Sequence, residues 1–203
     1  MPAHPIQRYL FAALLFPPAA NAAPANFSFD YIQATFTSST INLSASPEKI
    51  EGNGIGFNLS LSFNPHYAIT LDVLSSSFDT FQGNPVDSIK KTNLGLTAHT
   101  QITDSTEVFG NVSFLKAEFT KTDGISSTND TDVAYELKIG LRYFLSKSFE
   151  AELGVSHFYA FDYPATSLNA EIRYYAYKQI SIGFAYKTGD NQDSLSLNGR
   201  MSF

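Results

Sequence analysis

Charged side chains that could do chemistry recur at alternate positions of this chain, in stretches whose other parity is apolar. Side chains two residues apart share one face of a strand, so these charges would line one polar face. Buried charges must be paired, since an isolated one costs several kcal/mol. The near balance of signs therefore favours a structural ion-pair network over a conducting pore, which more often shows rings of one sign. The eleven positions are Asp72, Glu107, Glu136, Glu150, Glu152, Glu171, Lys138, Arg142, Arg173, Lys187 and Arg200.

The histidines do not predict a catalytic or metal site. His66, His99 and His157 fall in different predicted strands or turns, and the chain has no Cys to complete a zinc site. A Ser-His-acid site would need a serine next to His99 or His157 on a neighbouring strand, and serine is too common here to make such a match specific. We therefore expect a protein that is not an enzyme and has no cofactor or metal.

The end of the chain shows most clearly which elements must carry these charges. In Ser194–Phe203, Leu195, Leu197, Met201 and Phe203 share one parity, and polar residues take most of the other. This is the period-two pattern of a strand with one apolar face. Nine further stretches alternate similarly, which predicts ten strands at 26–37, 54–63, 67–75, 92–101, 107–119, 133–143, 149–159, 168–177, 180–187 and 194–203.

Connections of two lengths alternate between these strands. Short turns are predicted near residues 65, 104, 147 and 178, and Pro47, Pro65, Pro85 and Pro164 all fall in predicted turns or loops, where a missing backbone donor costs little. Centring the hairpins on the short turns places Asn58 opposite Asp72 and Arg142 opposite Glu152, and a four-residue loop at 189–192 would place Ser181 opposite Arg200. The longer loops are predicted at 38–52, 78–91, 121–131, 161–166 and 188–193.

These features predict an all-β fold, a transmembrane up-and-down antiparallel β-barrel of ten strands, with eight as the alternative if one weak element is misassigned. The even count would put both ends of the chain on the periplasmic side, with short turns there and long loops outside. The rival is a soluble, lipocalin-like barrel with its apolar face inside. Glycines on the polar face favour the membrane barrel, because a narrow lumen filled with long polar side chains needs small neighbours: Gly54, Gly56, Gly95, Gly140, Gly154 and Gly183.

Aromatic residues at the strand ends are predicted to meet the membrane interface. In the first strand, Ile32, Ala34 and Phe36 are predicted to face lipid, so Phe27 and Phe29 are assigned to an interfacial aromatic belt. The run from Phe158 to Tyr163 is assigned to the outer aromatic girdle, in preference to an adhesive or ligand-binding rim.

The first 22 residues read as a cleaved signal peptide. Arg8 precedes a short apolar run at 9–16, and Ala20-Asn21-Ala22 is a small-residue cleavage site. The apolar run is too short for a spanning helix, which needs about 20 residues. We expect residues 1–22 to be the signal peptide and residues 23–203 to be the barrel domain. The net charge of -6 and the lack of a basic tract argue against nucleic acid as a partner.

Four short motifs carry a resemblance to a known family. They are Asp30-Tyr31-Ile32, Gly54-x-Gly-x-Asn58, Asn64-Pro65-x-Tyr67 and the ending Gly199-Arg-Met-Ser-Phe203. With these, the mature chain resembles small bacterial outer-membrane β-barrel proteins, some described as porin-like or quorum-factor-like. The resemblance implies a fold and an outer-membrane location, but no reaction. It also implies that Phe203 is the signal read by the barrel-insertion machinery.

We therefore expect an outer-membrane barrel with a structural or surface-interaction role and no catalytic site. The alternative is a narrow channel for small solutes or ions, and a barrel enzyme acting on envelope lipid or peptide is the third class. Outer-membrane lipids and the insertion machinery are the expected partners, and we expect a monomer.

Overall fold

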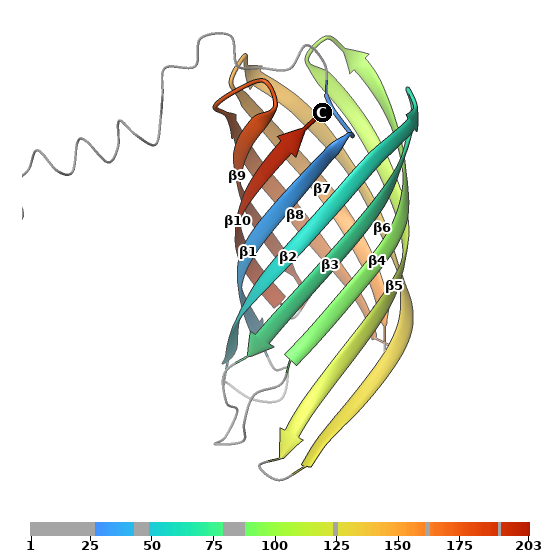
Figure 1. Cartoon of the computed structure of the whole chain (residues 1–203), viewed down its shortest axis with the longest axis vertical. Coiled ribbons are helices and arrows are strands. Elements are labelled where there is room, and N and C mark those ends of the chain that lie inside the picture. Colours follow the sequence, from blue (N-terminus) through green and yellow to red (C-terminus); the bar gives the residue numbers. More distant parts are fainter. Residues whose placement is uncertain (1–26, 43–48, 79–87, 124–125, 161–162, 191) are drawn as a thin grey trace, which may run out of the picture.

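The chain folds into one closed barrel of ten antiparallel strands (Figure 1). The computed structural model describes residues 27–42, 49–78, 88–123, 126–160, 163–190 and 192–203. Each strand pairs with its sequence neighbours, and the first pairs with the last. The strands are β1 Tyr31–Asn42, β2 Lys49–Asn64, β3 Tyr67–Phe78, β4 Ser88–Thr103, β5 Thr106–Asp123, β6 Ser126–Ser146, β7 Phe149–Ala160, β8 Tyr163–Tyr175, β9 Ile180–Gly189 and β10 Gln192–Ser202. The prediction of ten strands is confirmed, and the eight-stranded alternative is wrong.

The barrel is apolar outside and polar inside, the reverse of a soluble barrel. Ile55 and Ile139 are 71% and 68% exposed on the outer face, whereas Arg173 and Glu107 are 1% and 3% exposed inside. An apolar band around the whole barrel is stable in a bilayer and unfavourable in water. The lipocalin-like alternative is therefore wrong. Within the described residues, no helix has both the length and the apolar character needed to cross a membrane.

The two ends of the barrel differ in how the strands are joined. At one end, the turn end, short turns near residues 65, 104, 147 and 177 join neighbouring strands. One is fixed by Asn64, whose Oδ1 accepts hydrogen bonds from the backbone N–H groups of His66 and Tyr67 at 2.8 and 3.0 Å. The described residues nearest both chain termini meet at this end, where the Phe203 N–H donates to the Asp30 carbonyl at 3.0 Å. The opposite end is the loop end, at the bottom of Figure 1.

The pairing register follows the predicted parity. Asn58 pairs with Asp72, Arg142 with Glu152 and Ser181 with Arg200, all as predicted. The pairing of β1 with β10, which closes the barrel, keeps the same parity, since the inward-facing Gln33 of β1 lies opposite the inward-facing Arg200 of β10. A slip of one residue would move every charge to the outer face, so the apolar outer band fixes the register.

Several strands run further toward the loop end than predicted. β2 begins at Lys49, β4 at Ser88 and β8 at Tyr163, inside the predicted loops 38–52, 78–91 and 161–166. β5 and β6 run through most of the predicted loop 121–131, leaving only residues 124–125 between them. Once a hairpin is paired, backbone hydrogen bonds can continue where neither face needs to be apolar, so side-chain alternation no longer marks the strand.

The prediction for one proline and the predicted start of the first strand change with these bounds. Pro164 is the second residue of β8, opposite Tyr159, and not part of a loop. Pro65 does lie in a turn, whereas Pro47 and Pro85 lie outside the described residues. β1 starts at Tyr31, so residues 27–30 are not part of a strand as predicted.

Candidate functional site

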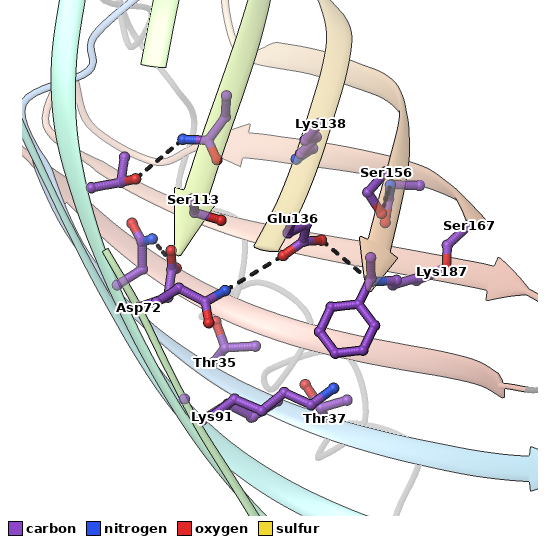
Figure 2. A pocket seen from close by; sticks show the side chains of 18 of the residues that line it. Thr35, Thr37, Asp72, Lys91, Ser113, Glu136, Lys138, Ser156, Ser167 and Lys187 are labelled. Atoms are coloured by element: carbon purple, nitrogen blue, oxygen red, sulfur yellow. Dashed lines mark hydrogen bonds and ion pairs between the residues drawn. The ribbon is translucent and has the colours of Figure 1, made fainter. Parts of the chain in front are cut away.

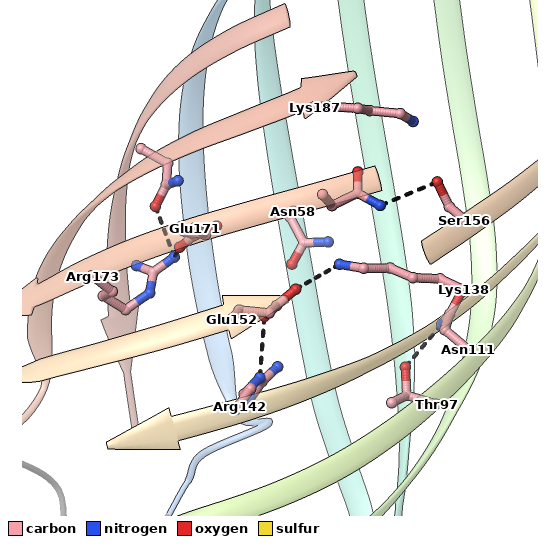
Figure 3. Close-up of polar contacts among 12 residues, drawn as sticks. Asn58, Thr97, Asn111, Lys138, Arg142, Glu152, Ser156, Glu171, Arg173 and Lys187 are labelled. Atoms are coloured by element: carbon pink, nitrogen blue, oxygen red, sulfur yellow. Dashed lines mark hydrogen bonds and ion pairs between the residues drawn. The ribbon is translucent and has the colours of Figure 1, made fainter. Parts of the chain in front are cut away.

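The inward-facing charges meet in the middle of the barrel, around Glu152 of β7 (Figure 3). Its Oε1 accepts from Lys138 Nζ at 2.7 Å, and its Oε2 accepts from Arg142 Nε at 3.3 Å. The two cations come from β6, four residues apart and therefore on one face of that strand. Arg142 Nη1 also lies 3.8 Å from Oε2 of Glu107, a residue of β5. Three adjacent strands are thus linked by one set of buried ion pairs.

A second group of contacts surrounds Arg173 of β8, which is almost completely buried. Its guanidinium pairs with Glu171 and donates to Asn198 Oδ1 at 2.8 Å. It also donates to Gln33 Oε1 at 3.1 Å, reaching β1 across β9 and β10. Arg200 Nε donates to the same Gln33 oxygen at 2.9 Å. Gln33 was not among the predicted site residues, although its inward parity in the first strand could have indicated it.

Two predicted charges find neutral partners. Arg200 lies over the Tyr31 ring, with its guanidinium carbon 4.0 Å from the ring centroid. Glu150, which is buried, accepts a hydrogen bond from the Tyr175 hydroxyl at 2.6 Å. Sequence reasoning paired acids with bases by counting, so it missed cation–π and phenol partners, which no charge count reveals.

The turn end of the lumen is filled by the segment that precedes β1. Phe27 stacks on Phe144 with ring centroids 4.3 Å apart. Phe29, only 3% exposed, stacks on His99 at 3.9 Å and lies 4.0 Å from the Arg142 guanidinium. The prediction that Phe27 and Phe29 belong to an interfacial belt is therefore wrong. Both continue the inward parity of Tyr31, so extending the β1 pattern backward would have placed them inside.

The carboxylate of Asp30 anchors this segment from the side. Its Oδ1 accepts a hydrogen bond from the backbone N–H of Ser62 in β2 at 2.6 Å. Together with the Phe203 contact to its carbonyl, this ties the segment to both neighbours of β1. We call Phe27, Phe29 and Tyr31, with the Arg142 guanidinium, the lumen floor.

A cavity of about 560 Å³, the loop-end cavity, runs along the lumen between the floor and the loop end (Figure 2). It extends from Phe29 and Tyr31 of the floor up to Gly189 and Gln192 near the loop end. In its wall Asp72 accepts a hydrogen bond from Asn58, the partner predicted by register. Glu136 Oε2 accepts from Asn93 Nδ2 at 3.4 Å, and its Oε1 is 3.9 Å from Lys187 Nζ.

Two residues of the cavity wall were assigned elsewhere by the sequence. Lys91 was placed in a loop, but it faces the lumen from β4, in the same parity as Asn93. Its Nζ lies 5.1 Å from the Phe158 ring centroid. Phe158 was assigned to the outer girdle, but it points inward and packs against Leu115, Ala117 and Ala134. Its neighbour Tyr159 faces outward and stacks on Tyr135, whereas Phe161 lies outside the described residues.

All ten residues of the predicted charge network face inward, although only some of them form ion pairs with each other. The ion pairs join Lys138 and Arg142 to Glu152, Arg173 to Glu171, and Lys187 to Glu136. The ten are Asp72, Glu136, Lys138, Arg142, Glu150, Glu152, Glu171, Arg173, Lys187 and Arg200.

The three histidines that the structure describes lie in separate places. His99 Nδ1 hydrogen-bonds Glu107 Oε1 at 2.9 Å, and His157 Nδ1 hydrogen-bonds Thr166 Oγ1 at 3.0 Å on the outer face. His66 is exposed in the β2–β3 turn. In the described part of the chain, no three His, Asp or Glu side chains are grouped so as to hold a metal ion.

Comparisons with known proteins give one family and a shared fold. The family model "Outer membrane protein beta-barrel domain" matches residues 9–195. No curated protein sequence matches the chain. The crystal structure of an outer-membrane channel from Pseudomonas putida F1 superposes with a TM-score of 0.54 and 11% identity, over 92% of this chain and 99% of that one. Surface protein A of Neisseria gives a TM-score of 0.48 and 12% identity, over 87% and 98% of the two chains.

Proposed function

The chain belongs to the outer-membrane β-barrel domain family, and from that premise we propose a non-conducting barrel with a structural or surface-interaction role. The family places it in the bacterial outer membrane, where short turns face the periplasm and long loops face outside. The observation that carries the proposal is the lumen floor, which closes the turn end of the lumen.

The floor is closed by contacts that water cannot easily replace. Phe29 lies between the His99 ring and the Arg142 guanidinium, and both faces of its ring are therefore covered. Arg142 is in turn held by Glu152 and Glu107. A conducting path through this region would have to separate buried ion pairs in a medium of low dielectric, which is costly.

A narrow channel is the second candidate, and the loop-end cavity is the observation that favours it. The cavity of about 560 Å³ already reaches Phe29 from the outer side. Withdrawal of residues 27–30 from the turn end would connect it to the periplasm. The two proposals therefore differ in one respect, whether the lumen floor stays in place.

Planar-bilayer recording tests both proposals. We expect no conductance steps from the purified wild-type protein, and small steps from the double variant Phe27→Ala/Phe29→Ala, which removes the aromatic part of the floor. Phe36→Ala is the matched control, because Phe36 lies on β1 but is 53% exposed on the outer face. Steps from the wild-type protein would support the channel and contradict the closed barrel.

We also propose that the protein is not an enzyme. His99 has an acidic partner in Glu107, as a catalytic histidine would, but its Nε2 has no hydrogen-bond partner among the described side chains. A nucleophile would have to occupy that position. Labelling of the folded protein by a fluorophosphonate, which modifies activated serines, would contradict this proposal.

Export by a cleaved signal peptide, monomeric state and recognition by the insertion machinery complete the proposal. Mass spectrometry of protein taken from the outer membrane is expected to give Ala23, or a residue next to it, as the first residue. Retention of residues 1–22 in that protein would overturn the assignment. Sedimentation in detergent is expected to give one barrel per particle.

A further inference from the structure

The loop-end cavity has the size and position of a small-molecule site. Its volume of about 560 Å³ lies within the range of roughly 300–1,000 Å³ that is usual for such sites. It extends from the lumen floor to Gly189 and Gln192 near the loop end, the end that faces outside in an outer-membrane barrel. The question is which chemistry its wall would select.

Lys91 is the cation of this cavity that lacks a counter-ion. No carboxylate of the described residues forms an ion pair with its ammonium, whose recorded neighbour is the face of the Phe158 ring. A cation held over an aromatic ring and facing a cavity is partly desolvated before any ligand arrives. An anion that binds it therefore gains a charge-assisted hydrogen bond without first displacing a carboxylate.

Lys187 on the other side of the cavity supplies a second cation. Its Nζ is 3.9 Å from Glu136 Oε1, longer than a direct hydrogen bond, and its side chain is 42% exposed. Figure 2 shows Lys91 and Lys187 reaching into the cavity from different strands. Glu136 is the acid nearest Lys187, and Asp72, another acid of this part of the wall, is hydrogen-bonded to Asn58.

We propose that the cavity binds a small organic carboxylate with a flat apolar body, its carboxylate between Lys91 and Lys187 and its body against Phe158. The half-buried Phe158 ring is fixed from behind by Leu115, Ala117 and Ala134, so it offers a rigid apolar surface. A neutral solute would leave the Lys91 ammonium without a counter-ion. The proposal goes beyond a structural role and holds whether or not the floor conducts.

Calorimetric titration with benzoate tests the site on the full barrel in detergent micelles, with empty micelles as the blank. Lys91→Met keeps the length of the side chain and removes its charge, and we expect it to weaken benzoate binding by about tenfold, the loss of one charge-assisted contact. Phe158→Leu is expected to weaken binding several-fold. Lys90→Met is the matched control, because Lys90 is the adjacent residue and is exposed, and it should bind like the wild type.

Two further ligands separate the parts of the proposal. Acetate carries the charge without the ring and should bind more weakly than benzoate, and benzyl alcohol carries the ring without the charge and should not bind. Lys91→Arg keeps the cation and should retain binding, which distinguishes loss of charge from loss of fold. The proposal is overturned if the folded wild type does not bind benzoate at millimolar concentration, or if Lys91→Met binds it unchanged.

Discussion

At the scale of single residues, each buried charge of the lumen is stabilised by a partner from another strand. Arg142 shows this most fully, because it contacts carboxylates of β5 and β7 and the ring of Phe29. Burying such a group without partners would cost several kcal/mol, so the partners decide whether the charge can be inside at all. The lumen network is therefore a condition of the fold as much as a candidate site.

Replacing Glu152 should destabilise the barrel strongly. Glu152→Gln keeps the shape but removes the negative charge shared by Lys138 and Arg142, and we expect the free energy of unfolding to fall by about 3 kcal/mol. Urea titration in lipid vesicles, followed by heat-modifiable gel migration, measures this. Glu118→Gln is the control, since Glu118 forms an exposed ion pair with Lys116 at 2.5 Å and should have little effect. Equal losses from both variants would contradict a role for burial.

Gly140 is required on the inward face of β6 because the Phe109 side chain lies against the strand there. A Cβ on Gly140 would lie 2.5 Å from Phe109 Cζ and 2.8 Å from the Leu153 carbonyl oxygen. We expect Gly140→Ala to lower the free energy of unfolding by about 1–3 kcal/mol, because the core must shift. The same assay applies, with Gly199→Ala as the control.

Gly199 suits that comparison because it lies on the outer face of β10, with no atom within 4 Å of a Cβ placed there. Gly199→Ala should therefore leave the free energy of unfolding unchanged. If Gly140→Ala were as stable as Gly199→Ala, the close packing of Phe109 on β6 would not be important for stability.

At the scale of elements, strand length is set by pairing and not by the apolar pattern. Residues 121–123 of β5 pair only with residues 126–128 of β6, because β4 reaches Thr120 and the pairing with β7 stops at Tyr135. This hairpin extends past the other strands at the bottom of Figure 1. It adds hydrogen bonds of its own but closes no part of the barrel.

Trimming that extension should leave the barrel intact. Replacing residues 121–128 by Asn-Gly, which favours a two-residue hairpin, is expected to change the free energy of unfolding by less than about 1 kcal/mol, the scale of one net hydrogen bond. Heat-modifiable migration should remain. A variant that no longer folds would show that the extension nucleates the β5–β6 pairing.

Phe203 follows the last strand, β10, and its role as insertion signal can be separated from any role in stability. Its ring is 59% exposed, so the purified Phe203→Ala variant should refold normally into vesicles. If Phe203 is the insertion signal, the same variant should reach the outer membrane as folded protein at a level several-fold lower than the wild type. Phe63→Ala is the matched control, because Phe63 is 58% exposed at the same end of the barrel. Normal membrane levels of Phe203→Ala would contradict its role as insertion signal.

At the scale of the whole molecule, the barrel is divided across its length. The lumen floor closes the turn end, and the cavity runs from the floor toward the loop end. This division underlies both proposals, since a closed floor argues against conduction and the cavity offers space for a solute. The described side chains do not form a ring of like charges across the lumen, which would indicate a selective pore.

The sequence by itself determined the architecture of this protein. The period-two pattern assigns an inward or outward face to each residue of a strand, and the short turns fix the register, so pairs such as Arg142 with Glu152 follow from counting along the chain. One face must be apolar in a bilayer, and this requirement acts on every strand alike. The sequence alone therefore supports ten strands, their order and the inward-facing charges of the predicted strands, but not Lys91.

Only the tertiary structure decided which inward residues meet and where the strands end. Barrel shear brings Gln33 of β1 to Arg173 of β8, and the segment before β1 folds beneath Arg142, relations between residues more than a hundred positions apart. Lys91 faces the cavity because pairing continued beyond the apolar pattern, whereas Phe158 follows the inward parity of the predicted strand 149–159. Local periodicity records the face of a side chain but not its height or its partner, because those depend on how the closed sheet is staggered.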